Sequence, residues 1–232
     1  MLEIETFGSN STGNCYLLKD GSSHLLLEAG INPKRMGIDW SKVEGVLISH
    51  EHQDHAKYAR DIVNRTVADI FCSAGTGSVL SGVPSHRVNH VEAKRNFTTD
   101  NWKIMPFDIE HDAKEPLGFL IETPSGQRVL FATDTYYIRY RFTGITHLMI
   151  ECNYSLEILE RNYQHRKIDK KQRNRIITSH FELNNVKQFL QSNNWDKLQE
   201  IHLLHLSDRN SDAEQFKKEI QAIVGVPTYI AE

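Results

Sequence analysis

Residues 49–55, here called the histidine loop, carry three histidines and an aspartate within six positions, directly after an apolar run. Because His50 and His52 are two residues apart, a tight turn at the end of a strand can direct both toward one metal ion. Asp54 and His55 then turn toward a second ion close by. Imidazole suits zinc, and mixed imidazole and carboxylate ligation also admits manganese or iron. A histidine-rich polar surface turn is the alternative, but the pattern predicts a metal centre.

The length and composition suit one α/β domain over residues 1–232, because 39% hydrophobic content in a chain of this size can bury a substantial core. A net charge of −3 gives no global attraction to nucleic acid or anionic lipid, so a polyanion must be held by a local patch or by metal. The acidic start and the lack of a long apolar segment predict no membrane association and a cytoplasmic location.

The three cysteines, Cys15, Cys72 and Cys152, are far apart and form no Cys-x-x-Cys pair. This spacing argues against a thiolate zinc finger and against a disulfide framework, and it fits a reducing compartment. We expect all three to be buried structural thiols, because free cysteine packs as a small hydrophobe.

Strands dominate the first part of the chain, and helices are interleaved later. The expected helices are 56–65, two within 156–175, 183–192, and a last one that starts at a capping box formed by Ser211 and Glu214. The expected strands are 2–7, 15–19, 24–28, one that ends at Ile48, 69–72, 86–91, 102–109, 117–122, 128–132 and 146–152. This order favours a layered sandwich of two central sheets with helices outside.

The pattern His-x-His-x-Asp-His at residues 50–55 resembles the signature of the metallo-β-lactamase fold superfamily. The resemblance implies an αββα sandwich whose metals lie at one edge of the two sheets. It also implies further ligands at strand ends, where His111, Asp134 and His205 match the third histidine, the bridging aspartate and the final ligand. One ion would then be held by His50, His52, His111 and Asp134, and the other by Asp54, His55, His205 and the shared Asp134.

His180 also follows an apolar run and competes with His205 for the last metal position. In RNase Z-like phosphodiesterases of this superfamily, a histidine at this place acts on the leaving group, and a later histidine in a His-x-Ser context binds metal. His205, with Ser207 two residues on, resembles the latter, so His180 is expected to be a general acid or phosphate ligand. Glu151 resembles the acidic partner that orients it. A capping or packing role for His180 is the alternative.

The chain as a whole is most similar to the YycJ/WalJ-type group of metallo-β-lactamase-fold nucleases. Glu28-Ala29-Gly30 departs from the common Asp-x-Gly, whose carboxylate braces the metal loop, and the residues after His180 depart from the usual Ser-Asn. The segments that carry the similarity are 8–15, the histidine loop, 111–118, 133–135, 151–153, 179–181 and 205–207.

The resemblance implies a phosphodiesterase with two divalent ions, zinc or manganese, which make hydroxide available near neutral pH. Asp54 is expected to accept the water proton and His180 to protonate the departing oxygen. Between Arg161 and Arg175 the chain carries seven lysines and arginines against one acid, an excess suited to a nucleic-acid backbone or to a solvated helix face. The expected substrate contacts are Ser207, Lys170, Lys171 and Arg173.

Three function classes follow. The first is a nuclease, similar to a 5′-to-3′ DNA exonuclease, with nucleic acid as partner and DNA preferred to RNA. The second is a small-molecule hydrolase that acts on a cyclic nucleotide, lactone or thioester with the same ions. The third is a non-catalytic binding protein of the same fold, which the intact set of ligands disfavours.

Overall fold

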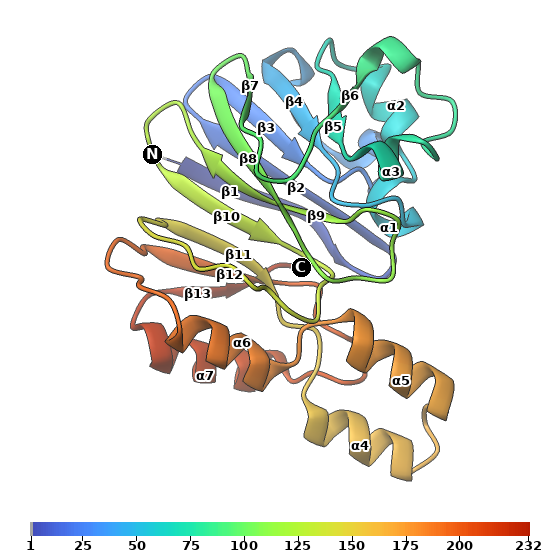
Figure 1. Ribbon diagram of the computed structural model, residues 1–232, viewed down its shortest axis with the longest axis vertical. Coiled ribbons are helices and arrows are strands. Elements are labelled where there is room, and N and C mark those ends of the chain that lie inside the picture. The colour runs from blue at the N-terminus through green and yellow to red at the C-terminus, as the bar shows by residue number, and fades with distance from the viewer. Residues whose placement is uncertain (1) are drawn as a thin grey trace. The chain divides into compact units, whose positions relative to one another are not determined.

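The computed structural model describes residues 2–232 and divides into two compact units (Figure 1). Unit 1 contains the chain up to Asp108, then Ala113–Val129 and Glu232. Unit 2 contains Ile109–Asp112 and Leu130–Ala231. The interpretation of residues 1–232 as one domain stays a prediction.

Unit 1 holds a six-stranded sheet in the order β1-β2-β3-β4-β5-β6. Strands β1 to β3 pair antiparallel and β3 to β6 pair parallel. Every residue of β3 is buried, which explains its continuous run of leucines. The strands are β1 (Leu2–Asn10), β2 (Gly13–Asp20), β3 (Ser23–Leu27), β4 (Val43–Leu47), β5 (Ile70–Cys72) and β6 (Val88–His90).

A second, antiparallel set of strands in unit 1 consists of β7 (Phe97–Thr99), β8 (Trp102–Asp108) and β9 (Leu117–Glu122). The unit boundary falls inside β10 (Arg128–Ala132). In unit 2, β11 (His147–Glu151), β12 (Glu200–Leu204) and β13 (Thr228–Ile230) run parallel to one another. The α/β class with two sheets, expected from the sequence, is confirmed.

The helices of unit 1 are short. The expected helix 56–65 is instead two helices, α1 (Gln53–Ala56) and α2 (Ala59–Val63), because the backbone N–H of Tyr58 donates to Ala29 O at 2.8 Å and breaks the ladder. Ile62 and Val63 pack into the apolar cluster beneath. The remaining short elements are η1 (Pro33–Arg35), η2 (Trp40–Lys42), α3 (Ala74–Gly77) and η3 (Ser85–Arg87).

Four longer helices belong to unit 2: α4 (Leu156–Gln164), α5 (Lys170–Ser179), α6 (Leu183–Gln191) and α7 (Ala213–Val224). Helix α6 packs beside α7, and α7 packs against β13 (Figure 1). Leu159, Ile168, Ile176 and Ile177 form a small apolar cluster, with Tyr154, that holds α4 against α5.

Helix α7 begins one residue later than the expected capping box. The N-cap is Asp212, whose carboxylate accepts a hydrogen bond from Gln215 N at 3.0 Å, so the interpretation of Ser211 as the cap is wrong. The competing carboxylate is the stronger acceptor for a helix N–H. The helix ends at Gly225, whose φ of 70° places it in the left-handed region that glycine adopts readily.

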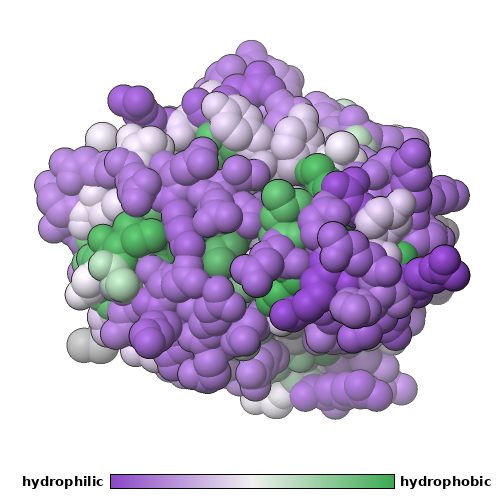
Figure 2. Space-filling view, turned by 90° about the horizontal axis from the view of Figure 1, so that it is seen from below, coloured by the Kyte–Doolittle hydropathy of each residue, from purple (hydrophilic) through white to green (hydrophobic). Residues whose placement is uncertain are grey.

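The three cysteines are free and buried, as expected. Within residues 2–232, no helix has the length and apolar character needed to cross a membrane. On the face shown in Figure 2, apolar residues form separate patches among polar ones. The exposed large apolar side chains include Val67 and Val79 in unit 1, and Tyr136, Tyr137 and Tyr163 in unit 2.

Candidate metal centre

The histidine loop of unit 1 follows β4 and gathers its imidazoles tightly. The ring of His50 lies 4.7 Å from that of His52 and 4.1 Å from that of His55, measured between centroids. The Nε2 atom of His55 lies 3.4 Å from a carboxylate oxygen of Asp54. His50 and His55 are fully buried. Such a donor set of imidazole nitrogens and a carboxylate fits zinc or manganese.

Glu28, directly after β3, contacts the histidine loop and braces it. Its buried carboxylate accepts hydrogen bonds from Ser49 N at 3.3 Å and lies 3.5 Å from Nδ1 of His55. The backbone adds a second tie, because Ala29 N donates to His55 O at 2.6 Å. A carboxylate on the far nitrogen of a ligating histidine fixes the ring and its tautomer. Glu28 therefore braces the histidine loop in place of the aspartate of the common Asp-x-Gly sequence.

Asn14 lies in the segment 8–15 that carries the family similarity, but its contact with the predicted metal ligands was not predicted. Its side chain is buried and lies 3.1 Å from Nε2 of His55 and 3.4 Å from a carboxylate oxygen of Asp54. In unit 2, Asn153 likewise contacts a predicted metal ligand, because its side-chain amide donates to His205 O at 2.7 Å. The available signal was that each asparagine adjoins a buried cysteine at the end or start of a strand.

Unit 2 gathers the later candidates. Asp134, Glu151, His180 and His205 each offer one ligand atom, and these atoms lie within 4.8 Å of one another. The Nδ1 atom of His205 lies 3.0 Å from a carboxylate oxygen of Asp134. A cluster of imidazoles and carboxylates of this kind indicates divalent metal binding.

His111 lies beside this cluster in unit 2. Its Nδ1–H donates to Ser179 O at 2.8 Å, and its Nε2 lies 3.7 Å from Asp134. Burial lowers the pKa of His111 below its ordinary value, against the opposing effect of the Asp134 carboxylate. The neutral, oriented imidazole that results is the form that binds metal.

Three of the site residues have unusual backbone torsion angles. Glu28, Asp134 and His205 have φ values of 66°, 46° and 52°, in the left-handed region that residues other than glycine seldom adopt. His205 directly follows β12, as Glu28 follows β3, so the turn begins where the strand ends. Strain of this kind, about 1–3 kcal/mol per residue, clusters at functional sites.

Glu151, at the end of β11, is the hub of the cluster in unit 2. Its fully buried carboxylate lies 2.7 Å from Nδ1 of His180 and accepts from Thr135 N at 2.9 Å and Phe181 N at 3.0 Å. Burial acts to lower the pKa of His180, but the charge and hydrogen bond of Glu151 outweigh burial and raise that pKa above its ordinary value. Burial acts to raise the pKa of Glu151, but the charge and hydrogen bond of His180 and the hydrogen bond of His205 hold that pKa below its ordinary value.

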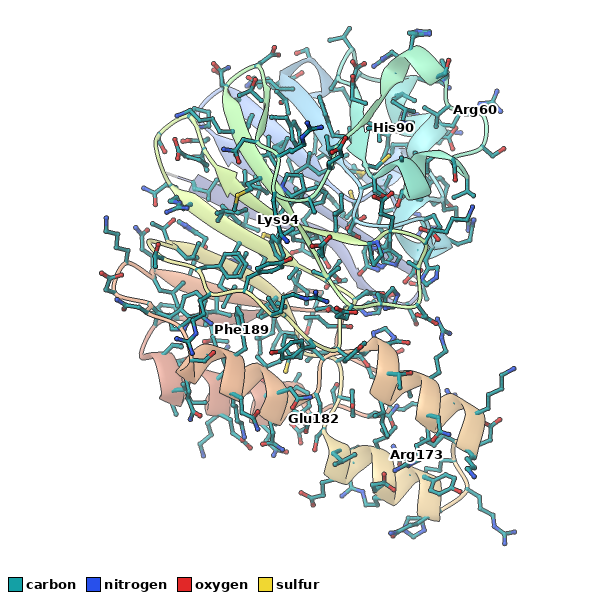
Figure 3. All side chains as sticks on the ribbon, in the orientation of Figure 1. Arg60, His90, Lys94, Arg173, Glu182 and Phe189 are labelled. Carbon is teal, nitrogen blue, oxygen red and sulfur yellow. The ribbon has the colours of Figure 1, made fainter. Side chains whose placement is uncertain are left out.

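The expected substrate residues lie in other parts of unit 2. Lys170 and Lys171 are exposed in the first turn of α5. Arg173 is engaged: it pairs with Glu160 and lies 5.6 Å from the centroid of the Tyr163 ring, on the α4–α5 pair visible in Figure 3. The backbone N–H of Ser207 donates to Asn153 O at 2.9 Å. Substrate contact by these residues stays a prediction.

The seven predicted ligands thus fall into two groups, one in each unit. His50, His52, Asp54 and His55 come together in unit 1, and His111, Asp134 and His205 in unit 2. That all seven share one pair of ions stays a prediction.

Comparison with known proteins identifies relatives. A family model described as "Beta-lactamase superfamily domain" matches residues 24–165. The chain is 23% identical over 177 residues to exodeoxyribonuclease YycJ from Bacillus anthracis, covering 68% of this chain and 65% of that protein. It is 27% identical over 168 residues to exodeoxyribonuclease WalJ from Streptococcus pneumoniae, covering 65% of this chain and 62% of that protein. Both matches therefore span a little under two thirds of the relative's length.

Among solved structures, the metallo-β-lactamase fold protein YhfI from Bacillus subtilis resembles the chain with a TM-score of 0.71. The likeness covers 100% of this chain and 96% of YhfI at 14% sequence identity, so it shows the fold alone. The fold and the YycJ/WalJ resemblance expected from the sequence are both confirmed.

Proposed function

We propose, because this chain belongs to the beta-lactamase superfamily, that it is a metal-dependent phosphodiesterase that cleaves nucleic acid, with DNA as the preferred substrate. A metal-dependent hydrolase is the enzyme class that its relatives and its groups of imidazoles and carboxylates indicate. The observation that carries the proposal of phosphodiester cleavage is the Glu151–His180 pair at 2.7 Å, beside Asp134 and His205. Such a pair supplies a positioned proton donor for a leaving oxygen.

The donor sets fit two divalent ions, zinc or manganese. One ion would be held by His50, His52, His111 and Asp134, and the other by Asp54, His55, His205 and the shared Asp134. When bound, such ions supply a hydroxide nucleophile near neutral pH and neutralise the charge on phosphodiester oxygens.

The protein's own side chains accept and donate the protons and position the reacting groups. Asp54, 21% exposed, is less buried than its neighbour His55 and is placed to accept the proton of the attacking water. Glu151 holds His180 through Nδ1, which leaves Nε2 of that ring to donate a proton to the departing oxygen. Glu28 holds His55 through Nδ1 and so acts as a positioning residue, and the Asn14 amide lies beside Nε2 of the same ring.

Replacing His180 with alanine should lower turnover by roughly 10²–10⁴-fold, the usual contribution of a positioned acid. The bound metal should remain, because His180 is assigned to the leaving group. Steady-state kinetics and elemental analysis of the purified variant check both parts. The matched control is His86→Ala, which removes an exposed histidine from unit 1. Loss of metal along with turnover would make His180 a ligand instead.

The segment between Arg161 and Arg175 supplies a candidate track for the substrate backbone. Arg166, Lys167, Lys170 and Lys171 are exposed, and none has an ion-pair partner within residues 2–232. Arg173, held by Glu160 and Tyr163, fixes α5 against α4. Exposed cations without partners are suited to phosphate oxygens.

The double variant Lys170→Glu/Lys171→Glu should weaken binding of single-stranded DNA and flatten its salt dependence. Each lost phosphate contact should reduce the slope of log affinity against log salt by about 0.7. Fluorescence anisotropy at several salt concentrations measures both quantities. Lys217→Glu/Lys218→Glu, an adjacent pair on α7, makes the same change of charge elsewhere in unit 2 and should bind as the wild type does. Equal losses in both double variants would argue against the track.

The function itself is tested with end-labelled single- and double-stranded DNA and RNA, together with cyclic dinucleotides, incubated with the protein in zinc or manganese. Stepwise shortening of DNA from the 5′ end is the expected result. Turnover confined to cyclic dinucleotides would replace the proposal with a small-molecule phosphodiesterase. Asp134→Ala serves as the inactive control.

A further inference from the structure

A cavity of about 530 Å³ lies within unit 2, bordered by residues 136–141 and by helix α6. This volume falls in the range of roughly 300–1,000 Å³ that small-ligand pockets occupy. Residues 136–141 read Tyr-Tyr-Ile-Arg-Tyr-Arg and contain no acid. Its lining residues include Tyr136, Tyr137, Tyr140, Arg141, Phe181 and Phe189.

The cavity is tied to the catalytic cluster of unit 2 through the chain itself. Tyr136 stands two residues after Asp134, and Phe181 directly follows His180. The backbone N–H of Tyr136 donates to Glu110 O at 3.1 Å, and that of Phe181 donates to Glu151 at 3.0 Å. Phe181, one wall of the cavity, is therefore held by the same carboxylate, Glu151, that positions the proposed proton donor.

Aromatic rings form the base of the cavity. Phe181 and Phe189 lie 6.3 Å apart between ring centroids, and Phe142 extends the cluster at 6.4 Å from Phe189, which Figure 3 labels on α6. Tyr136 and Tyr137 are 39% and 55% exposed. Exposed tyrosine rings beside a packed aromatic base offer flat faces on which a planar ligand can stack.

The charge and polarity of the other lining groups define the ligand further. Arg139 is neutralised by an ion pair with Glu110, whereas exposed Arg141 has no ion-pair partner among the residues described. Asn185 and Gln188, on α6, supply amide donors and acceptors. Arginine is suited to phosphate, and amides are suited to the edges of bases.

We infer that this cavity binds one nucleotide of a single-stranded nucleic acid, with its base stacked on the tyrosines and its phosphate at Arg141. The inference rests on the proposed function and names the contact that would select a nucleotide chain over other phosphodiesters. Stacking on aromatic side chains tolerates any base, so the site reads a single strand without reading its sequence.

The test compares wild type, Tyr137→Ala and Tyr137→Phe on a single-stranded oligonucleotide and on bis(p-nitrophenyl) phosphate, with manganese present. Tyr137→Ala should reduce kcat/KM for the oligonucleotide about 5- to 150-fold relative to that for the small ester, the usual value of one stacked base. Tyr137→Phe keeps the ring and should restore the wild-type ratio. Tyr229→Ala, an exposed tyrosine on β13, is the matched control and should leave the ratio unchanged.

A second readout reports position directly. Oligonucleotides that carry 5-iodouracil are bound in EDTA, irradiated and digested, and the cross-linked peptide is identified by mass spectrometry. A cross-link within residues 136–141 is the expected result. An unchanged kcat/KM ratio in Tyr137→Ala, or cross-links only elsewhere, would overturn the inference while leaving the hydrolase intact. If metal-loaded wild type hydrolyses neither substrate, the proposed function falls, and the inference falls with it.

Discussion

Asp134→Ala is expected to empty the metal centre and to reduce phosphodiester hydrolysis by more than the roughly 10–100-fold typical of lost outer-shell partners. Asp134 is the only proposed ligand shared by both ions. Its carboxylate lies 3.0 Å from His205 Nδ1 and 3.7 Å from His111 Nε2, so it is the common neighbour of both histidines in unit 2. Removing it leaves those imidazoles without the charge that offsets a divalent cation.

Elemental analysis after reconstitution, combined with kinetics, measures this effect. Asp134→Asn is the sharper variant, because asparagine tolerates the φ of 46° at this position and removes only the charge. Both variants should lose metal, and Asp196→Ala, at an exposed aspartate in unit 2, should retain it. A fully loaded Asp134→Asn would show that the shared-ligand assignment is wrong.

Gly30→Ala is expected to destabilise unit 1 by about 1–3 kcal/mol or more, as overpacking in a tight site does. A Cβ atom at this position would overlap the carbonyl oxygen of Asp54 and lie 2.6 Å from Asn14 N. Both obstacles are backbone atoms, so neither can move aside cheaply. The histidine loop would have to shift, and its metal affinity would fall with it.

Urea denaturation and metal titration together check this prediction. Gly37→Ala is the matched control, because a Cβ at Gly37 would meet no atom within 4 Å. That variant should stay within about 0.5 kcal/mol of wild type. A Gly30→Ala protein with wild-type stability and metal content would mean that the loop accommodates a side chain there.

The strand ends were predictable, because an apolar run followed by a polar, metal-binding residue is a local pattern. His111, Asp134 and His205 each follow an apolar run, but the family resemblance is what singled them out as ligands; the structure brings them together in unit 2. Contacts that depend on distant partners were not predictable. Asn14 reaches His55 across 41 positions, and the cysteine beside Asn14 does not indicate which distant residue its side chain contacts.

The same limit explains the break between α1 and α2. Tyr58 ends the helical ladder because its N–H is taken by Ala29 O, a partner in another element. The run of tyrosine and arginine at residues 136–141 was visible in the sequence. That these residues line a cavity was not predictable, because the opposite wall is α6 and only the tertiary fold brings the two segments together.

The left-handed backbone at Glu28, Asp134 and His205 has a consequence for loading the enzyme. Each of these residues turns away from its sheet within two positions of the last strand residue, so little flexible chain separates the side chain from a rigid scaffold. Immobilising a free side chain on binding costs about 0.5–1.5 kcal/mol. Groups already held in place avoid that cost, so preorganisation raises the affinity for an arriving cation.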